Sequence, residues 1–170
     1  MSDIVVVVGF QAEEVARTVL KSRPDAIIAV NHNFADTGTA ASLRLGATFA
    51  KGEVIGLDGD LLISRASLEL FFDSKHTLIG ITEIVTKEPH SVSLNNGFVD
   101  EFDTETDTGW EWCGPVALSK SDCLNLGDRH IYQGLIKLLP IAAVAVDAVE
   151  IDFPNDIERA KVWINRQDEF

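Results

Sequence analysis

The chain has 170 residues, 46% of them apolar, and carries 27 acidic against 14 basic side chains for a formal net charge of −13. This length and apolar content predict one folded domain, residues 1–170, with a sizeable core. Such an acidic surface is expected to repel a nucleic-acid backbone. No apolar run approaches the roughly 18 residues that a membrane span needs. The opening "MSDIVVVVGF" lacks the basic segment of a signal peptide, so we expect a cytoplasmic protein with no nucleic-acid or membrane partner.

The two cysteines, Cys113 and Cys123, have no CxxC or Cys/His ligand pattern around them. This usage is typical of packing thiols in a reducing compartment.

The first half of the chain alternates apolar runs, typical of strands covered on both faces, with stretches of helical periodicity. In chain order we expect a strand at 3–9, a helix at 10–24, a strand at 26–31, a helix at 39–52, a strand at 53–60, a helix at 64–76 and a strand at 77–85. Ser64 stands where a helix N-cap is preferred, and Gly52 where a helix is expected to end. The βαβαβαβ series predicts an α/β fold with a Rossmann-like, mostly parallel sheet and helices on both faces.

The second half adds a different pattern. Two short strands around Asn95, Asn96 and Gly97 predict a β-hairpin at 91–102. Beyond it we expect a strand at 109–119, a helical stretch at 131–139, a strand at 143–152 and a helix from Pro154 to 167. The sequence therefore predicts one α/β domain with an antiparallel excursion in its second half.

Acidic residues follow two of the expected strands. "VIGLDGDLL", residues 54–62, ends an apolar run with Asp58 and Asp60, and "VEID" delivers Asp152 just before a helix. In open α/β sheets ligands bind beyond the carboxyl ends of the strands. Two carboxylates meeting there suit Mg²⁺, which fills its other positions with water and phosphate oxygens. Spacing alone leaves two other interpretations open: Asp58 caps a loop, or Asp152 caps the following helix.

Five blocks in order, "IVVVVGFQAEEV", "NHNFADTGTAASLRLG", "GLDGD", "GWEWCGPVALS" and "VEIDFPNDIERA", span nearly the whole chain. Together they resemble the sugar-phosphate and phospho-alcohol nucleotidyltransferases with a GT-A-like fold, including the phosphocholine cytidylyltransferase type. The resemblance implies that Asp60 and Asp152 are catalytic and bind Mg²⁺, with Asp58 assisting through water and Gly59 near the nucleotide. It implies transfer of a nucleoside monophosphate from a nucleoside triphosphate to a phosphorylated sugar or phospho-alcohol, releasing pyrophosphate.

The sequence departs from that family at its start. Family members begin with a G-x-G-x-R-x-x-x-x-P-K loop that holds the triphosphate, and this chain has no such motif. Gly9 is a lone glycine and cannot replace it. The resemblance thus implies an N-terminally truncated nucleotidyltransferase-like domain. We expect a homo-oligomer, or a partner chain that completes the site. A non-catalytic homologue acting as a binding or assembly subunit is the alternative.

Further candidates concern the substrate. The resemblance places Thr37, Thr39 and Ser42 near the mouth of the site, although Gly38 stands where family members have Asn. Trp110 and Trp112 lie on the same side of a predicted strand, and they are candidates for an aromatic cage around a quaternary ammonium such as choline. The alternative for these two tryptophans is ordinary packing, and the alternative for Thr39 and Ser42 is a helix-capping segment.

Overall fold

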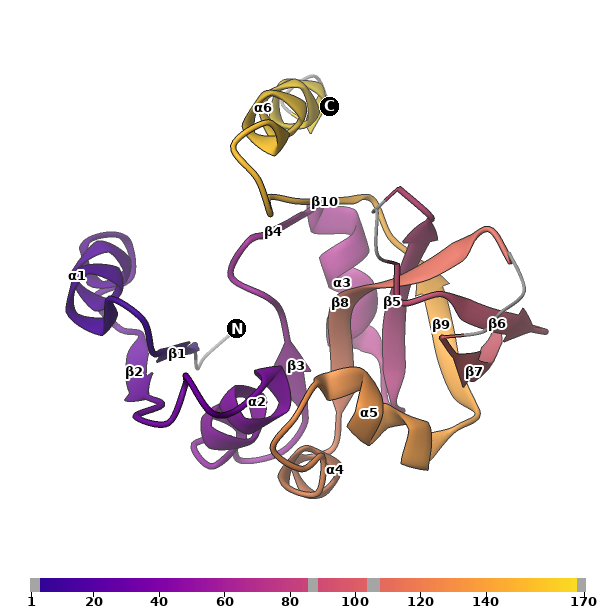
Figure 1. Cartoon of the computed structure of the whole chain (residues 1–170), viewed down its shortest axis with the longest axis horizontal. Coiled ribbons are helices and arrows are strands. Elements are labelled where there is room, and N and C mark those ends of the chain that lie inside the picture. The colour runs from indigo at the N-terminus through magenta and orange to yellow at the C-terminus, as the bar shows by residue number, and fades with distance from the viewer. Residues whose placement is uncertain (1–3, 86–88, 104–107, 168–170) are drawn as a thin grey trace. The chain divides into compact units, whose positions relative to one another are not determined.

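The computed structural model describes residues 4–85, 89–103 and 108–167, which group into two compact units (Figure 1). The first unit contains the residues up to 54 and 118–138. The second contains 55–117 and the residues from 139 onward. Among the helices in the described ranges, none is both long and apolar enough to cross a membrane. The prediction of a single domain stays a prediction.

The first unit consists of a two-stranded parallel sheet and helices. Its elements are β1 (Val5–Val8), α1 (Ala12–Ser22), β2 (Ile27–Val30), α2 (Thr39–Ala47), α4 (Lys120–Leu124), α5 (Ile131–Leu135) and the 3-10 turn η1 (Ile136–Leu138). Strands β1 and β2 run parallel, with Val5 opposite Ile27 and Val8 opposite Val30. Both α1 and α2 pack on β1, while α4 and α5 pack on α2. Helix α2 thus packs between strand β1 and the two helices α4 and α5.

Both ends of α2 are fixed by residues from the segment 120–129. The amide of Gly38 donates to the carbonyl of Asp128 at 2.8 Å, and a Cβ at Gly38 would lie 2.3 Å from the carbonyl oxygen of Arg129. Only glycine allows this approach. At the other end, Lys120 Nζ donates to the carbonyls of Ala50 (2.6 Å) and Thr48 (3.2 Å). A basic side chain thereby satisfies carbonyls beyond the helix end, which comes at Ala47 and not at the predicted Gly52.

The second unit is built on a six-stranded sheet. Its elements are β3 (Val54–Gly56), β4 (Leu61–Ile63), α3 (Arg65–Asp73), β5 (Leu78–Glu83), β6 (Val92–Asn95), β7 (Phe98–Phe102), β8 (Trp110–Leu118), β9 (Ile141–Ala145), β10 (Ala148–Glu150) and α6 (Asp156–Gln167). The strand order in the sheet is β3-β8-β5-β9-β7-β6, and β4 pairs separately with β10. The unit boundaries fall inside β3 and β8 in the sequence.

The predicted α/β class is confirmed, and so is the hairpin. Asn96 (φ 51°) and Gly97 (φ 82°) both adopt left-handed conformations between β6 and β7, as a tight two-residue hairpin turn requires. Strand directions differ from the expected, mostly parallel sheet. Strands β5 and β9 are parallel, whereas β5–β8, β7–β9 and β6–β7 are antiparallel. The hairpin and β8 enter the sheet from the opposite direction, which makes it a mixed sheet.

Helix α3 supplies the core on one face of this sheet. Phe71 is 1% exposed and packs with Ala117 of β8 and Val146. A Cβ at Gly80 would lie 3.3 Å from the Phe71 ring, so the glycine gives the ring its space on β5. Ser64 caps α3 as predicted, because its hydroxyl accepts from the amide of Ser67 at 3.2 Å.

The predicted strand at 143–152 is divided in two. Between β9 and β10, the amide of Asp147 donates to Ser67 Oγ at 2.9 Å, and its carboxylate accepts from Trp163 Nε1 (2.6 Å) and Gln167 Nε2 (2.7 Å). These contacts from α3 and α6 turn the chain out of the six-stranded sheet. Strand β10 consequently pairs with β4.

Candidate functional site

Pairing of β4 with β10 brings two acidic segments together in the second unit. The strands are antiparallel, with Glu150 opposite Leu61, and the amide of Ile151 donates to the main-chain carbonyl of Asp60 at 3.0 Å. As a result, carboxylate oxygens of Asp60, Glu150 and Asp152 all lie within 4.8 Å of one another. The structure therefore brings together the two aspartates singled out in the sequence and adds a glutamate between them.

The cluster is electrostatically unfavourable for the protein alone. Burial raises the pKa of Glu150 to about 7, with further contributions from the charges of Asp152 and Asp60. Burial also raises the pKa of Asp58 to about 6, and the charge of Asp60 adds to it. A raised carboxyl pKa means that the surroundings disfavour the ionised form. A bound cation would reverse this penalty.

No cation of the protein neutralises the cluster within the described ranges, where the side chains of Asp60, Glu150 and Asp152 make no hydrogen bond or ion pair. Arg159 of α6 donates to the main-chain carbonyl of Glu150 (3.0 Å), not to its carboxylate, and pairs with Asp156 (3.4 Å). Three unpaired carboxylates whose oxygens lie within 4.8 Å of one another are donors of the kind that Mg²⁺ and Ca²⁺ prefer. The donor set therefore fits a hard divalent cation.

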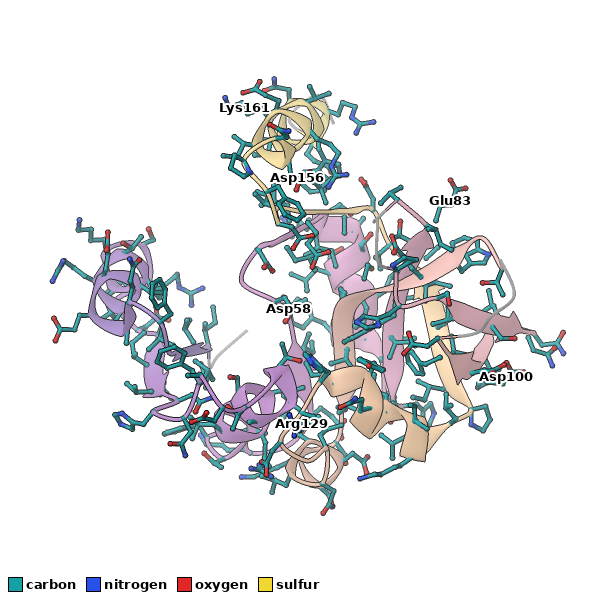
Figure 2. The ribbon with its side chains drawn as sticks, in the orientation of Figure 1. Asp58, Glu83, Asp100, Arg129, Asp156 and Lys161 are labelled. Carbon is teal, nitrogen blue, oxygen red and sulfur yellow. The ribbon has the colours of Figure 1, made fainter. Side chains whose placement is uncertain are left out.

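Asp58 lies outside this triad, against the backbone of β8. A Cβ at Gly114, where φ is +106°, would lie 2.7 Å from Asp58 Oδ2 (Asp58 is labelled in Figure 2). The glycine allows both the left-handed backbone and the close carboxylate. Gly59 is exposed, and a Cβ there would meet no atom within 4 Å. Its predicted position near the nucleotide stays a prediction.

Comparison with solved structures identifies the fold. The inositol-1-phosphate CTP transferase from T. maritima superposes with a TM-score of 0.79 at 18% identity, covering 99% of this chain and 78% of that chain. CTP:phosphocholine cytidylyltransferase from Streptococcus pneumoniae (LicC) gives a TM-score of 0.72 at 18% identity, covering 96% of this chain and 79% of that chain. HddC from Yersinia pseudotuberculosis gives a TM-score of 0.71 at 17% identity, covering 94% of this chain and 77% of that chain. The chain has the nucleotidyltransferase fold. No protein-family model and no curated protein sequence matches it.

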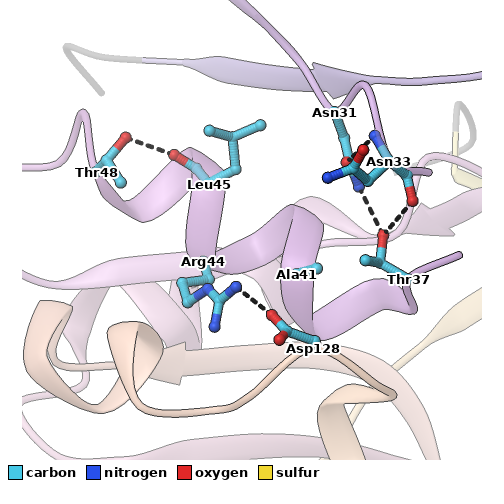
Figure 3. A pocket seen from close by; sticks show the side chains of 8 residues that line it. All are labelled: Asn31, Asn33, Thr37, Ala41, Arg44, Leu45, Thr48 and Asp128. Atoms are coloured by element: carbon cyan, nitrogen blue, oxygen red, sulfur yellow. Dashed lines mark hydrogen bonds and ion pairs between the residues drawn. The ribbon is translucent and has the colours of Figure 1, made fainter.

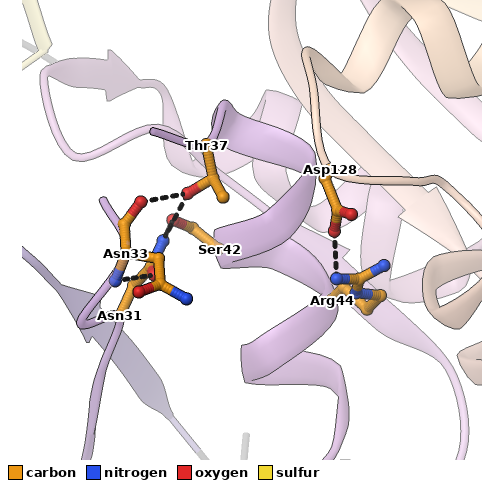
Figure 4. Close-up of polar contacts among 6 residues, drawn as sticks. All are labelled: Asn31, Asn33, Thr37, Ser42, Arg44 and Asp128. Atoms are coloured by element: carbon orange, nitrogen blue, oxygen red, sulfur yellow. Dashed lines mark hydrogen bonds and ion pairs between the residues drawn. The ribbon is translucent and has the colours of Figure 1, made fainter. Parts of the chain in front are cut away.

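The first unit of this nucleotidyltransferase fold contains a cavity of about 390 Å³ beside α2 (Figure 3). Its lining residues are Asn31, Asn33, Thr37, Ala41, Arg44, Leu45, Thr48 and Asp128. Asn31 Nδ2 donates to Thr37 Oγ1 (3.1 Å) and Ser42 Oγ (3.3 Å), and Arg44 pairs with Asp128 (Figure 4). The hydrogen bonds of Asn31 hold the loop between β2 and α2 in place.

Thr39 and Ser42, which were predicted to lie near the substrate, make hydrogen bonds within the first unit. Thr39 Oγ1 accepts from the amide of Ile131 at 3.2 Å, at the start of α5, and Ser42 Oγ takes part in the Asn31 network. Their predicted role at the mouth of a site stays a prediction.

The two tryptophans of β8 differ in their surroundings. Trp112 lies edge-on to Phe102, with ring centroids 6.3 Å apart, and its Nε1 donates to the carbonyl of Pro115 at 3.3 Å. Trp110 lines a cavity of about 530 Å³ together with Glu83, Ile84 and Gly109. Trp112 thus has the contacts of a packing residue, which was the alternative interpretation, whereas Trp110 lies at a cavity wall. An aromatic cage made of both stays a prediction.

The sequence reasoning missed Glu150. The available signal was its spacing from Asp152, because residues two apart in an extended segment point to the same side. The cysteines match the expected packing thiols, since burial raises the pKa of Cys113 and of Cys123 to about 12.

Proposed function

We propose that this chain binds a divalent cation, Mg²⁺ being the one expected, through Asp60, Glu150 and Asp152, and uses it in nucleotidyl transfer. The reaction moves a nucleoside monophosphate from a nucleoside triphosphate to a phosphorylated sugar or phospho-alcohol. The observation that carries the proposal is the unpaired carboxylate triad on a nucleotidyltransferase fold. Oligomerisation, or a partner chain that completes the site, stays a prediction.

In this reaction a phosphate oxygen of the acceptor forms a bond to the α-phosphorus. The bond from that phosphorus to the bridging oxygen breaks, and pyrophosphate leaves with the electron pair. A bound Mg²⁺ supplies charge neutralisation for the phosphates, which matters more for phosphoryl-type transfer than covalent help does. The three carboxylates would hold the ion, and the β4–β10 pairing fixes their mutual positions. The net charge of −13 is compatible with this role, because the cation mediates between acid and phosphate.

A second function, a metal-binding subunit without transferase activity, is favoured by one observation. Within the described residues no basic side chain contacts the triad carboxylates, and the sequence lacks the glycine-rich triphosphate motif described above. Such a subunit would bind the cation and leave a triphosphate intact.

Pyrophosphate release distinguishes the two. The purified chain with Mg²⁺ is assayed with CTP, UTP, GTP and ATP, each combined with phosphocholine, inositol 1-phosphate or glucose 1-phosphate. We expect release with one pair, reduced at least a hundredfold in Asp60→Asn and unchanged in Asp100→Asn, which removes an exposed carboxylate on β7. No release from any pair, with cation binding retained, would refute transfer by this chain alone and support the subunit.

A further inference from the structure

Strand β1 has an open edge. The carbonyls of Ile4 and Val8 each accept a hydrogen bond of 2.8 Å from amides on the β2 side. Because backbone groups alternate along a strand, the N–H and C=O groups of Val5 and Val7 point to the opposite edge. Within the described residues, β1 pairs with β2 and with no further strand on that edge.

The surroundings of β1 are those of an interior strand. Helices α1 and α2 both pack on it, and a Cβ at Gly46 of α2 would lie 3.2 Å from Val7 Cγ2 and 3.9 Å from Val5 Cγ1. Its sequence is four valines, without the lysine, proline or bulge that protects natural edge strands. This edge is therefore built for a further strand.

Apolar side chains continue the edge at its carboxyl end. Phe10, two residues after β1, is 72% exposed, and Phe34 and Val30 are 44% and 40% exposed. The rings of Phe10 and Phe34 meet edge to face, with centroids 6.4 Å apart. Phe10 and Phe34 therefore form an exposed aromatic patch near the carboxyl end of β1.

Charge favours a second copy of the same chain as the occupant. The residues of the first unit include eight acids and eight bases, so the whole net charge of −13 belongs to the residues of the second unit. Two first units can approach through β1 without a net repulsion between them. The edge is also self-complementary, since each copy offers the same donors and acceptors at Val5 and Val7.

We propose that β1 pairs with β1 of a second copy, antiparallel across a two-fold axis, which makes a four-stranded sheet in the order β2-β1-β1-β2. Pairing would satisfy the outward groups of Val5 and Val7 and cover Phe10. This dimer is independent of the proposed transfer chemistry, which rests on residues of the second unit.

Hydrogen exchange at single amides tests the pairing. In the dimer the amides of Val5 and Val7 should be protected, and dilution below the dissociation constant should remove their protection. The amides of Val6 and Val8, which face β2, should stay protected throughout and provide the internal control. Sedimentation equilibrium gives the mass over the same concentrations.

Two variants complete the test. Val7→Pro removes an outward N–H without touching the β2 side and should give a monomer. The milder Phe10→Ser should weaken dimerisation about a hundredfold, because the symmetric dimer loses this aromatic contact twice, at about tenfold for each copy. Its matched control, Phe98→Ser, alters a phenylalanine 48% exposed on the hairpin and should leave the mass unchanged. A monomeric wild type, a dimer with unprotected Val5 and Val7 amides, or a different chain bound at this edge would overturn the proposal.

Discussion

Replacing Asp58 by asparagine should stabilise the metal-free protein at pH 8 and leave it unchanged near pH 3.5. Asp58 is half-buried, and burial together with the charge of Asp60 raises its pKa from 3.8 to about 6. A carboxyl group whose folded-state pKa is raised contributes stability below its unfolded pKa of 3.8, and that contribution is lost as the pH rises to about 6. Above pH 6 the folded state holds an unfavourable charge that asparagine lacks.

The magnitude follows from the shift. About two pKa units correspond to about 3 kcal/mol as an upper limit. Solvent screens the half-buried Asp58 carboxylate, so we expect a gain of about 1–2 kcal/mol at pH 8. For a chain of this size the gain corresponds to an increase in melting temperature of about 3–6 °C.

Thermal melting with a chelator present, followed by circular dichroism from pH 3.5 to 8, measures the effect. Asp100→Asn, which removes an exposed carboxylate from the same unit, should change the melting temperature by less than about 1 °C at any pH. A melting temperature for Asp58→Asn that falls at pH 8, or that rises equally at both ends of the range, would refute the electrostatic reasoning.

Three further substitutions test the packing around the site by chemical denaturation. Gly114→Ala should cost about 1–3 kcal/mol, because φ is +106° and the new Cβ would lie 2.7 Å from Asp58 Oδ2; a neutral result would contradict the close approach. Ser64→Ala should cost about 1 kcal/mol through loss of the α3 cap to Ser67, and no loss would mean that the cap is dispensable. Phe71→Ala should cost about 3–5 kcal/mol, and a cost below 1 kcal/mol would place Phe71 outside the core.

Local signals in the sequence predicted the local structure. Asn96 and Gly97 specify a hairpin turn because both residues tolerate left-handed backbone, and Ser64 specifies a helix start through its own hydroxyl. The five-residue helix α4 was missed, although Ser119 caps it, because one turn is too short to show a periodic pattern.

Long-range contacts explain what the sequence could not predict. The break between β9 and β10 depends on Asp147, whose partners Ser67, Trp163 and Gln167 come from two distant helices. That break creates the β4–β10 pairing and so brings Glu150 to the aspartates. The sequence could therefore locate acids at strand ends, while the third carboxylate depended on a pairing that no local pattern encodes.

Titration of Mn²⁺ as a spectroscopic substitute for Mg²⁺, followed by electron paramagnetic resonance, tests the central claim most directly. We expect one bound ion per wild-type chain, with affinity reduced at least tenfold in Asp60→Asn and in Glu150→Gln and unchanged in Asp100→Asn. Equal affinity in all four proteins, or no bound ion in the wild type, would contradict a divalent-cation site at Asp60, Glu150 and Asp152.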